Sequence, residues 1–379
     1  MGPLEGLLIV DLTRVLAGPY CTLILADLGA RVVKVEKPVT GDDSRSFPPF
    51  KNGTSAYFRS LNRGKESIAL DLKSADDRTI FEALLSKADV LIENFRAGVL
   101  GRLGYDWETL HSRFPELILA QTSGFGQTGP IASRPAYDVV VQAMGGIMSL
   151  TGQPGSPPTR VGSSVGDITA GLFTTIGILS ALRHRNETGE GISIDVSMLD
   201  SQVAILENAI ARYVATEEVP TPLGSRHPSI APFQAFATSD GYLVIAAGND
   251  SLFKGCCQIL GCAELATDPR FIDNMRRVKN VNELESIFEE IMQRESTGTW
   301  LERFETAGIP CGPIQNVAEV LSDPQVLARN MVITSSGLTM AGNPIKLGGF
   351  EDPSERTAAP DLDADRAKIL AELFGDKSI

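Results

Sequence analysis

Three short stretches of the chain carry residues whose type and spacing could do chemistry. The first is Gly124-Phe-Gly126-Gln-Thr-Gly129, a G-x-G-x-x-G pattern that directly follows a predicted strand. A dinucleotide site needs such a loop to open a helix whose N-terminus faces the pyrophosphate. Here Pro130 and Pro135 follow, and they keep the chain extended or turning. The pattern therefore favours a glycine loop with positive φ angles or a close backbone approach.

The second stretch is Gly162-Ser-Ser164-Val-Gly166, which has the G-x-S-x-G form of a hydrolase nucleophile elbow. That motif follows a strand and needs a histidine base and an acidic group later in the chain. The preceding residues 155–160 have the composition of a loop, and His184 lies on the helix just after the motif. His227 is then the remaining base, so a serine hydrolase using Ser164 stays open as an alternative.

The third stretch contains Asp167, within Gly166-Asp-Ile-Thr-Ala-Gly171 at the start of a predicted helix over Ala170–Leu182. A carboxylate at a helix N-cap accepts the free amide hydrogens two and three residues further on. The positive end of the helix dipole would also keep Asp167 ionised, and the flanking glycines leave space for a bulky substrate. A carboxylate nucleophile needs that access. Taken alone, Asp167 is either a helix cap or a nucleophile.

The elements that must position these stretches alternate between strands and helices over the first 200 residues. Short aliphatic runs with Gly, Pro or polar boundaries predict buried strands, and helical spacing lies between them. This alternation predicts an α/β domain with a parallel, doubly wound, Rossmann-like sheet that binds its ligand beyond the carboxyl ends of the strands. The predicted strands are Leu7–Leu12, Arg31–Val35, Val90–Glu93, Leu117–Thr122 and Ile192–Val196, and the predicted helices are Pro19–Leu28, Ala75–Lys87 and Trp107–Phe114.

The texture of the sequence changes after Thr216. Four prolines crowd into residues 220–232, which is typical of a linker. Two apolar runs then flank Ser239-Asp240-Gly241, a connection suited to an antiparallel hairpin, and helical patterns follow. We therefore predict a smaller α+β domain. Its hairpin strands are Phe233–Thr238 and Tyr242–Ala247, and its helices are Ser251–Leu260, Asn282–Gln293 and Thr299–Ala307.

The last part of the chain is expected to return to the first domain. It contains a helical pattern at Ala318–Asn330, strand-like runs at Met331–Thr334 and Ile345–Gly348, and an amphipathic helix at Ala364–Phe374. The expected organisation is a large domain at residues 1–212, a linker at 213–232, a small domain at 233–316 and a return to the large domain at 317–379.

Composition limits the classes of partner. The 379 residues include 34 basic and 47 acidic side chains, a net charge of −13, which disfavours a general nucleic-acid or anionic-membrane surface. Five cysteines without a Cys-x-x-Cys pair fit neither a disulfide framework nor a zinc site, so we expect no metal and a reducing cytoplasm. The N-terminus lacks a signal-peptide pattern, and the longest apolar run, Ala170–Leu182, is shorter than the roughly 20 residues that span a bilayer.

Read together, many ordered stretches resemble the class III CoA-transferases, the family of formyl-CoA transferase and carnitine CoA-transferase. The resemblance covers nearly the whole chain and is more specific than any single glycine motif. Its stretches are Leu12–Pro19, Leu28–Pro38, Asn62–Lys73, Ala88–Arg96, Ser123–Pro130, Arg134–Asp138, Gly166–Asp167, Glu187–Gly191 and Gly308–Pro313.

The resemblance implies an acyl-CoA:carboxylate CoA-transferase with Asp167 as its nucleophile. The carboxylate would form a mixed anhydride with the donor acyl group and then an aspartyl-CoA thioester. Coenzyme A and acyl-CoA would be substrates, with no permanently bound cofactor. The family fold implies a homodimer of two interlocked rings, with the active site between the large and small domains.

The resemblance also implies the residues that line the site. The expected CoA contacts are Val15, Leu16, Lys37, Leu70, Lys73, Asn94, Phe95, Arg102 and Tyr137, and charge and placement add Arg96 and Arg134. Phe47 and Tyr57 match positions of an acyl pocket. His227 and Arg14, with Arg45, Arg59 and Arg160, are candidates for binding a second carboxylate, as in succinate or a branched C4–C5 acid.

Two departures from the family pattern bear on the substrate. Leu16 stands where formyl-CoA transferase has a glutamine, and a glycine-rich insertion is missing, which argues against oxalate as the acceptor. Racemases of 2-methylacyl-CoA share this fold but have a histidine where Tyr137-Asp138 stand, so this chain lacks an obvious base for proton transfer at Cα. Transferase is favoured and racemase is the alternative, while the donor, the acceptor and the pathway stay open.

Overall fold

The computed structural model of the chain describes residues 2–375, which form two compact units. The first unit contains the chain up to Met148, Arg160–Glu218 and the chain from Pro324 onward. The second contains Ser149–Thr159 and Val219–Asp323. The expected linker at residues 213–232 begins inside helix α10 (Glu207–Thr216). The chain passes from the first unit into the second after Glu218 and returns to the first unit at Pro324. The domain limits drawn from the sequence therefore stay predictions.

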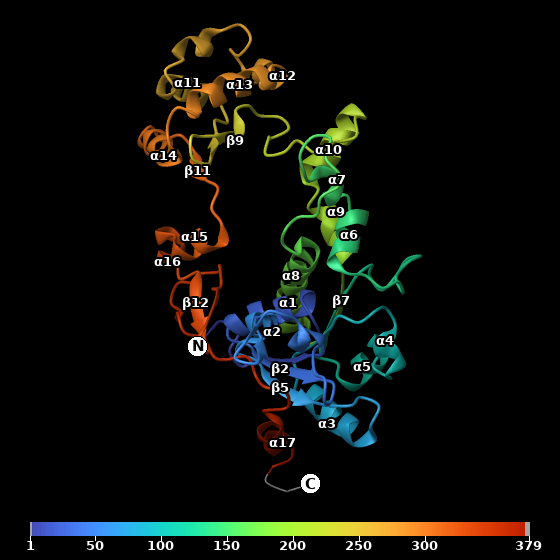
Figure 1. Cartoon of the computed structure of the whole chain (residues 1–379). Helices are drawn as coiled ribbons and strands as arrows, with labels where there is room; N and C mark the ends of the chain where they lie inside the picture. Colours follow the sequence, from blue (N-terminus) through green and yellow to red (C-terminus); the bar gives the residue numbers. More distant parts are fainter. Residues whose placement is uncertain (1, 376–379) are drawn as a thin grey trace. The chain divides into compact units, whose positions relative to one another are not determined.

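The first unit is built on a six-stranded parallel sheet (Figure 1). Its strand order is β5-β2-β1-β6-β7-β8. The chain moves outward from β1 through β2 to β5, then returns to the other side of β1 for β6, so the order reverses between β1 and β6. A crevice at such a reversal is where parallel sheets bind ligands. The bounds are β1 Leu8–Asp11, β2 Arg31–Glu36, β5 Glu66–Ala69, β6 Val90–Glu93, β7 Ile118–Ser123 and β8 Ser193–Ser197.

Helices cover both faces of this sheet. Ile9 shares a core cluster with α1 and α8, whereas its neighbour Val10 shares the opposite cluster with Phe81 of α3 and Leu110 of α5. Because both faces are buried, the strands are nearly continuous aliphatic runs, which is why the sequence predicts most of them. The helices up to residue 216 are α1 Ala17–Asp27, α2 Ala56–Asn62, α3 Ala75–Leu85, α4 Val99–Arg102, α5 Trp107–Arg113, α6 Asp138–Met144, α7 Ile147–Leu150, α8 Val165–Thr188, α9 Met198–Ala204 and α10 Glu207–Thr216.

Helix α8 is longer than the apolar run at Ala170–Leu182, because it starts at Val165 and continues through a charged last turn. By length and composition, α8 is the one helix of the described chain that could cross a membrane. Its inner side is fully buried against the sheet and α1 at Ala170, Ile178 and Ala181, as in a core helix.

The second unit has an antiparallel sheet covered by helices. Strands β9 (Phe233–Ala237) and β10 (Tyr242–Ala246) form the predicted hairpin, and β11 (Cys311–Pro313) pairs with the other edge of β10. Phe236, Phe253 and Phe288 belong to its buried core. Its helices are α11 Asp250–Ile259, α12 Asn274–Lys279, α13 Val281–Met292, α14 Thr297–Thr306 and α15 Val317–Ser322.

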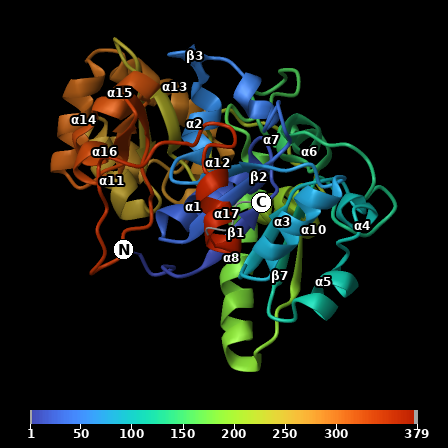
Figure 2. The ribbon, with the colours of Figure 1, turned by 90° about the horizontal axis from the view of Figure 1, so that it is seen from below.

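The C-terminal part differs from its sequence prediction at two places. The expected helix over Ala318–Asn330 is split, because Pro324 starts a new helix, α16 (Pro324–Ala328). Ile345–Gly348 is a loop rather than a strand, while β12 (Val332–Ser335) pairs with β13 (Leu338–Ala341). Helix α17 (Arg366–Phe374) lies beside α3 and buries Ile369 in the sheet's core (Figure 2). A small hairpin of β3 (Phe50–Lys51) and β4 (Thr54–Ser55) completes the first unit.

Candidate active site

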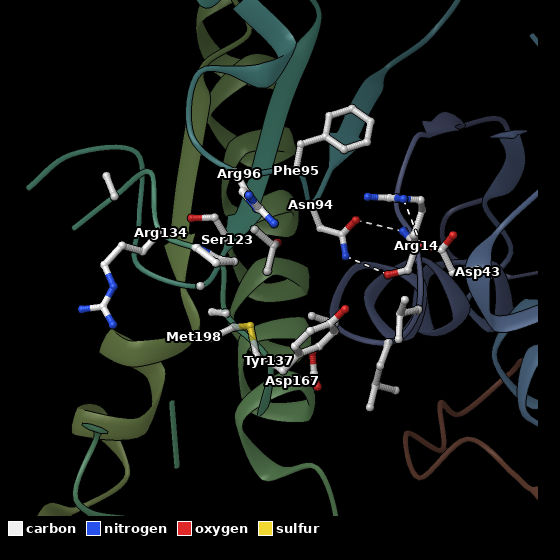
Figure 3. Close-up of a pocket in the computed structure, with 18 residues that line it drawn as sticks. Arg14, Asp43, Asn94, Phe95, Arg96, Ser123, Arg134, Tyr137, Asp167 and Met198 are labelled. Carbon is white, nitrogen blue, oxygen red and sulfur yellow. Dashed lines mark hydrogen bonds and ion pairs between the residues drawn. The ribbon is translucent and has the colours of Figure 1, made fainter. Parts of the chain in front are cut away.

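A pocket of about 200 Å³ lies in the first unit where β1, β6 and β7 end and α8 begins (Figure 3). The loop after β1 supplies Arg14–Ala17, the residues after β6 supply Asn94–Arg96, and α8 supplies Asp167. The pocket thus occupies the reversal point of the strand order. It brings together a large part of the predicted site, namely Arg14, Val15, Leu16, Asn94, Phe95, Arg96, Arg134, Tyr137 and Asp167.

A second pocket of about 300 Å³ lies beyond the ends of β2 and β5. It contains the predicted residues Lys37, Leu70 and Lys73. Arg14 and Phe95 line both pockets, and the guanidinium carbon of Arg14 lies 5.9 Å from the centre of the Phe95 ring. The two pockets therefore meet at this pair and together follow one edge of the sheet. Arg102, on α4, lines neither pocket.

Asp167 does not cap helix α8, so that interpretation of the residue is wrong. The helix starts at Val165, which makes Asp167 its third residue, and Ser164 occupies the N-cap position without a side-chain bond. The carboxylate of Asp138 instead accepts the Gly166 N–H at 2.8 Å. Residue 166 must be small there, because a Cβ would lie 2.7 Å from the Val141 side chain and 3.0 Å from Asp138.

The pKa of Asp167 is higher than the position of this carboxyl at the positive end of the helix dipole would predict. Burial, together with the negative charge of Asp138, raises the pKa of Asp167 to about 7. The backbone amide of Ala17 faces the Asp167 carboxyl and lowers its pKa, in the opposite direction. Both protonation states of Asp167 are therefore populated near neutral pH, which corrects the expectation of a fixed carboxylate.

Five predicted cations surround the two pockets with exposed side chains. They are Lys37, Lys73, Arg96, Arg102 and Arg134. None of these five side chains takes part in an ion pair among residues 2–375, so their charges are not neutralised there. Arg134 lies over the Phe125 ring, with its guanidinium carbon 5.7 Å from the ring centre. Unpaired cations in a chain of net charge −13 favour an anionic ligand at this edge.

The other candidate arginines already have partners. Arg45 pairs with Glu36 at 2.7 Å, Arg59 donates to the carbonyl of Ser336, and Arg160 donates to the carbonyls of Val161 and Gly162. None of these three lines the pocket of Asp167. Arg14 does, with Asp43 as its exposed partner at 2.9 Å.

The predicted acyl-pocket aromatics lie together but do not line the pocket surface. The ring centres of Phe47 and Tyr57 are 5.8 Å apart. Burial, with the charge of Asp167, raises the pKa of Tyr57 to about 12, so its hydroxyl lies within electrostatic range of Asp167. His227 belongs to the second unit, where its ring packs 5.2 Å from Phe233 and its Nδ1 accepts the Ser229 N–H at 3.1 Å.

The structure shows a plain glycine loop at Gly124–Gly129 and does not have the context of a nucleophile elbow at Ser164. Gly126 and Gly129 have φ angles of 82° and 95°, and no helix opens at that loop. Gly126 N–H donates to the Ser123 hydroxyl at 2.9 Å. Residues 157–163 form no strand before Ser164, so the context of a nucleophile elbow is missing.

Sequence reasoning missed Asp138 as a site residue. It starts α6, and its carboxylate bonds both Gly166 and the Gln142 side chain, the latter at 2.6 Å. An acidic residue just before an apolar run, with a glutamine four residues later, was the available signal. Asp43 and Met198 also line the pocket without having been singled out.

Comparisons with known proteins agree with this geometry. A sequence profile described as CoA-transferase family III matches residues 4–366. The chain is 50% identical over 373 residues to acetyl-CoA:oxalate CoA-transferase of Acetobacter aceti, covering 98% of this chain and 96% of that protein. It is 41% identical over 380 residues to succinyl-CoA:glutarate CoA-transferase of Mus musculus, covering 99% and 87%. The crystal structure of a CAIB/BAIF family protein from Brucella suis superposes with a TM-score of 0.88 at 41% identity, covering 98% of this chain and 99% of that one.

Proposed function

The chain belongs to CoA-transferase family III and is an acyl-CoA:carboxylate CoA-transferase, and we propose that it transfers CoA to a small dicarboxylic acid through covalent intermediates on Asp167. One observation carries this proposal. Asp167 is a carboxyl group without an ion-pair partner among the described residues, in a pocket that continues, past Arg14 and Phe95, into a second pocket bordered by unpaired cations. A thioester carbonyl in the first pocket and a phosphorylated nucleotide along the second would fit this arrangement.

Coenzyme A would enter as a substrate rather than as a resident cofactor. Its phosphates need charge-assisted hydrogen bonds, and the exposed cations at the sheet edge offer them. Phe95 offers a flat apolar face for the adenine or the pantetheine, and Leu70 an apolar wall. Val15, Leu16 and Tyr137 would border the thioester arm beside Asp167. The phosphate-binding cations in this proposal are Lys37, Lys73, Arg96, Arg102 and Arg134.

The proposed reaction starts with attack of the ionised Asp167 carboxylate on the donor thioester carbonyl. The C–S bond breaks, and the electron pair leaves with the CoA thiolate, which gives a mixed anhydride. The thiolate then attacks the aspartyl carbonyl, so the donor acid leaves and an aspartyl-CoA thioester remains. The acceptor carboxylate then attacks the aspartyl-CoA thioester and releases the CoA thiolate, which gives a mixed anhydride of Asp167 and the acceptor. The thiolate attacks the acceptor carbonyl of this anhydride, so that acceptor acyl-CoA forms and the Asp167 carboxylate is regenerated. The Ala17 N–H would stabilise negative charge that develops on the aspartyl oxygen.

The acceptor is proposed to be a dicarboxylate. The names of the Acetobacter aceti and Mus musculus relatives specify oxalate and glutarate, which both carry two carboxylates. Arg14 is one of three arginines that line the pocket, and a second carboxylate could reach it by displacing the exposed Asp43. The relative named for oxalate is 50% identical, which supports keeping oxalate among the proposed acceptors despite Leu16.

We also propose that the parallel sheet acts as a Rossmann-like, doubly wound CoA-binding domain and that two chains form an interlocked homodimer in the cytoplasm. The strand order and the helices on both faces support the first point. Exposed apolar side chains on α8 and α10, including Phe173, Ile176, Tyr213 and Val214, support a subunit interface. The dimer awaits a measurement of mass in solution.

The test is a CoA-transfer screen on the purified enzyme and on Asp167→Asn. Acetyl-CoA and succinyl-CoA serve as donors, and oxalate, succinate, glutarate and a branched C5 diacid as acceptors, with products identified by mass spectrometry. We expect transfer with the unchanged enzyme and at least about a thousandfold loss in Asp167→Asn, because the nucleophile is gone. Hydroxylamine added during turnover should convert Asp167 to a hydroxamate. Full transfer by Asp167→Asn would refute the proposed role.

A further inference from the structure

The turn between β1 and α1 holds a backbone conformation that its sequence disfavours. Val15 has a φ of 68°, in the left-handed region that β-branched residues rarely adopt. Such a conformation persists only where the surrounding structure fixes it. Val15 lines the pocket of Asp167, two residues before Ala17, which lines the same pocket and whose amide lowers the pKa of Asp167.

Side chains bond every polar backbone group from the Thr13 N–H to the Val15 N–H. Asp11 accepts the Thr13 N–H at 2.8 Å, and the Lys34 ammonium donates to the Thr13 carbonyl at 2.7 Å. The Asn94 carboxamide accepts the Arg14 N–H and donates to the Arg14 carbonyl, both at 2.8 Å (Figure 3). Asp42 accepts the Val15 N–H at 3.1 Å. We call Asp11, Lys34, Asp42 and Asn94 the turn frame.

The charges of the turn frame are buried and paired. Lys34 and Asp42 are fully buried and lie 2.9 Å apart. Asp11 is equally buried and pairs with Lys65 at 3.2 Å. Asp42 is fixed further, because its Oδ1 accepts the Ser44 N–H at 2.9 Å and the Ser44 hydroxyl at 2.7 Å. Buried ion pairs contribute little net stability compared with apolar side chains of similar volume. Stability alone is therefore a poor explanation for so many ions beneath one turn.

The turn leads directly into α1, whose first residue is Ala17. The distance between α1 and α8 is set at Gly171, where a Cβ would lie 2.7 Å from the Ala17 carbonyl oxygen. The start of α1 is therefore held close to α8 on one side and follows the turn on the other. We propose that Lys34, Asp42 and Asn94 are positioning residues, which hold Val15 in its left-handed conformation so that the Ala17 N–H stays aimed at the Asp167 carboxyl. This inference rests on the proposed role of Asp167.

The readout of this role is the ionisation of Asp167, because a lost amide bond would favour its neutral form. The groups that face Asp167 are Asp138 on α6 and Tyr57 on α2, together with the ionisable side chains of the pocket. Those side chains are Arg14, Asp43, Arg96, Arg134 and Tyr137. All of them are left unchanged in the double variants tested.

Two double variants separate the backbone bonds from the ion pair. Lys34→Gln with Asp42→Asn removes both charges but keeps a donor for the Thr13 carbonyl and an acceptor for the Val15 N–H. Lys34→Met with Asp42→Leu removes the charges and the bonds together at similar volume. Glu66→Gln is the control, since it removes one charge of a partly exposed ion pair with Arg31, on β5 and away from the pockets. Folding is checked by circular dichroism and thermal unfolding.

We expect the apolar double variant to lose about tenfold or more in kcat, with the KM for acyl-CoA changed by less than about threefold. The acid limb of its kcat profile should move to higher pH by about half a unit to one unit. The polar double variant should recover a large part of both effects. Glu66→Gln should behave as the unchanged enzyme. A folded apolar variant with an unchanged kcat and acid limb overturns the inference, as does a polar variant that is impaired to the same degree.

Asn94→Leu keeps the inference testable if the apolar double variant does not fold. It removes both bonds to Arg14 without leaving a charge in the core, and it should move the acid limb in the same direction. An unchanged acid limb in folded Asn94→Leu counts against the turn frame. Asp167→Asn is measured in parallel. If that variant is inactive while the frame variants keep the acid limb, the inference alone fails, whereas activity in Asp167→Asn removes the proposed function itself.

Discussion

The negative charge of Asp138 is fixed beside Asp167, because Asp138 caps helix α8 through the Gly166 N–H at 2.8 Å. The cap and the nucleophile candidate are thus two different carboxyl groups, since Asp138 on α6 binds the amide of the residue just before Asp167. Their repulsion, with burial, holds the pKa of Asp167 near 7. A carboxyl group with that pKa changes its charge easily near neutral pH, which suits a group that is proposed to be acylated and released in every cycle.

The first prediction concerns the acid limb of the activity profile. Asp138→Asn keeps an oxygen that can accept the Gly166 N–H, but it removes the charge that raises the pKa of Asp167. The acid limb of kcat/KM should then move to lower pH by about one unit. Steady-state rates from pH 5 to pH 9 measure this shift.

Asp138→Ala provides the comparison for this prediction. It removes the charge and the cap together, so it should also lose about 1 kcal/mol of stability. An acid limb that stays in place in both variants would show that Asp138 does not control the ionisation of Asp167.

The second prediction concerns stability. The folded pKa of Asp167, about 7, lies above its ordinary value of 3.8, so the folded state binds a proton more tightly than the unfolded state. This contribution to stability is fully present below pH 3.8 and is lost as the pH rises through 7. The side chain of Asp167→Asn does not ionise, so the stability of this variant does not fall through this group as the pH rises. Its melting temperature should therefore rise relative to that of the unchanged enzyme between pH 5 and pH 8, by several degrees.

Differential scanning fluorimetry at both pH values makes the comparison. Asp43→Asn, an exposed pocket acid, is the control and should show no pH-dependent gain. An Asp167→Asn advantage of equal size at pH 5 and pH 8 would mean that the carboxyl ionises normally in the folded enzyme.

The third prediction tests the approach of α1 to α8. In Gly171→Ala the new methyl group would lie 2.7 Å from the Ala17 carbonyl oxygen, so the two helices must separate. We expect a loss of about 1–3 kcal/mol in stability, as for overpacking elsewhere, and a fall in kcat. Gly177→Ala on the same helix is the control for overpacking away from α1, because its methyl would lie 2.9 Å from the Ile194 side chain on β8. Equal kcat values in the two variants would argue against a role for helix spacing in catalysis.

Much of the sheet could be predicted because its strands are buried on both faces. Val90-Leu91-Ile92, for example, is an uninterrupted aliphatic run within a short segment, which is typical of a strand buried on both faces. Strand β5 was missed because Glu66 and Ser67 use their polar side chains in tertiary bonds, to Arg31 and to Glu36. The local sequence does not indicate these partners, because Arg31 lies 35 residues from Glu66 and Glu36 lies 31 residues from Ser67.

The sequence allowed a prediction of which residues lie near Asp167, but not of the raised pKa of Asp167. The residues expected around Asp167 follow largely from the family resemblance, and many of them line one pocket. The raised pKa of Asp167 depends on α6 packing against α8, where Gly166 admits the Asp138 carboxylate at close range. Likewise, the left-handed Val15 depends on side chains from β2, β6 and the loop before Ser44. Both are properties of packing between distant segments, which a single sequence does not specify.

The last prediction concerns the sign of charge at the sheet edge. Lys73 and Lys87 stand just before and just after helix α3, so they lie at opposite ends of one element, and Lys73 lines the second pocket. If Lys73 contacts a CoA phosphate, Lys73→Ala should raise the KM for acyl-CoA about three- to tenfold with little change in kcat, since a single phosphate contact of this kind acts on binding. The increase should shrink at high salt, where the contact is screened in the unchanged enzyme as well. Lys87→Ala, which removes the same charge from the other end, should leave KM unchanged, and equal effects in the two variants would point to net charge rather than to a phosphate site.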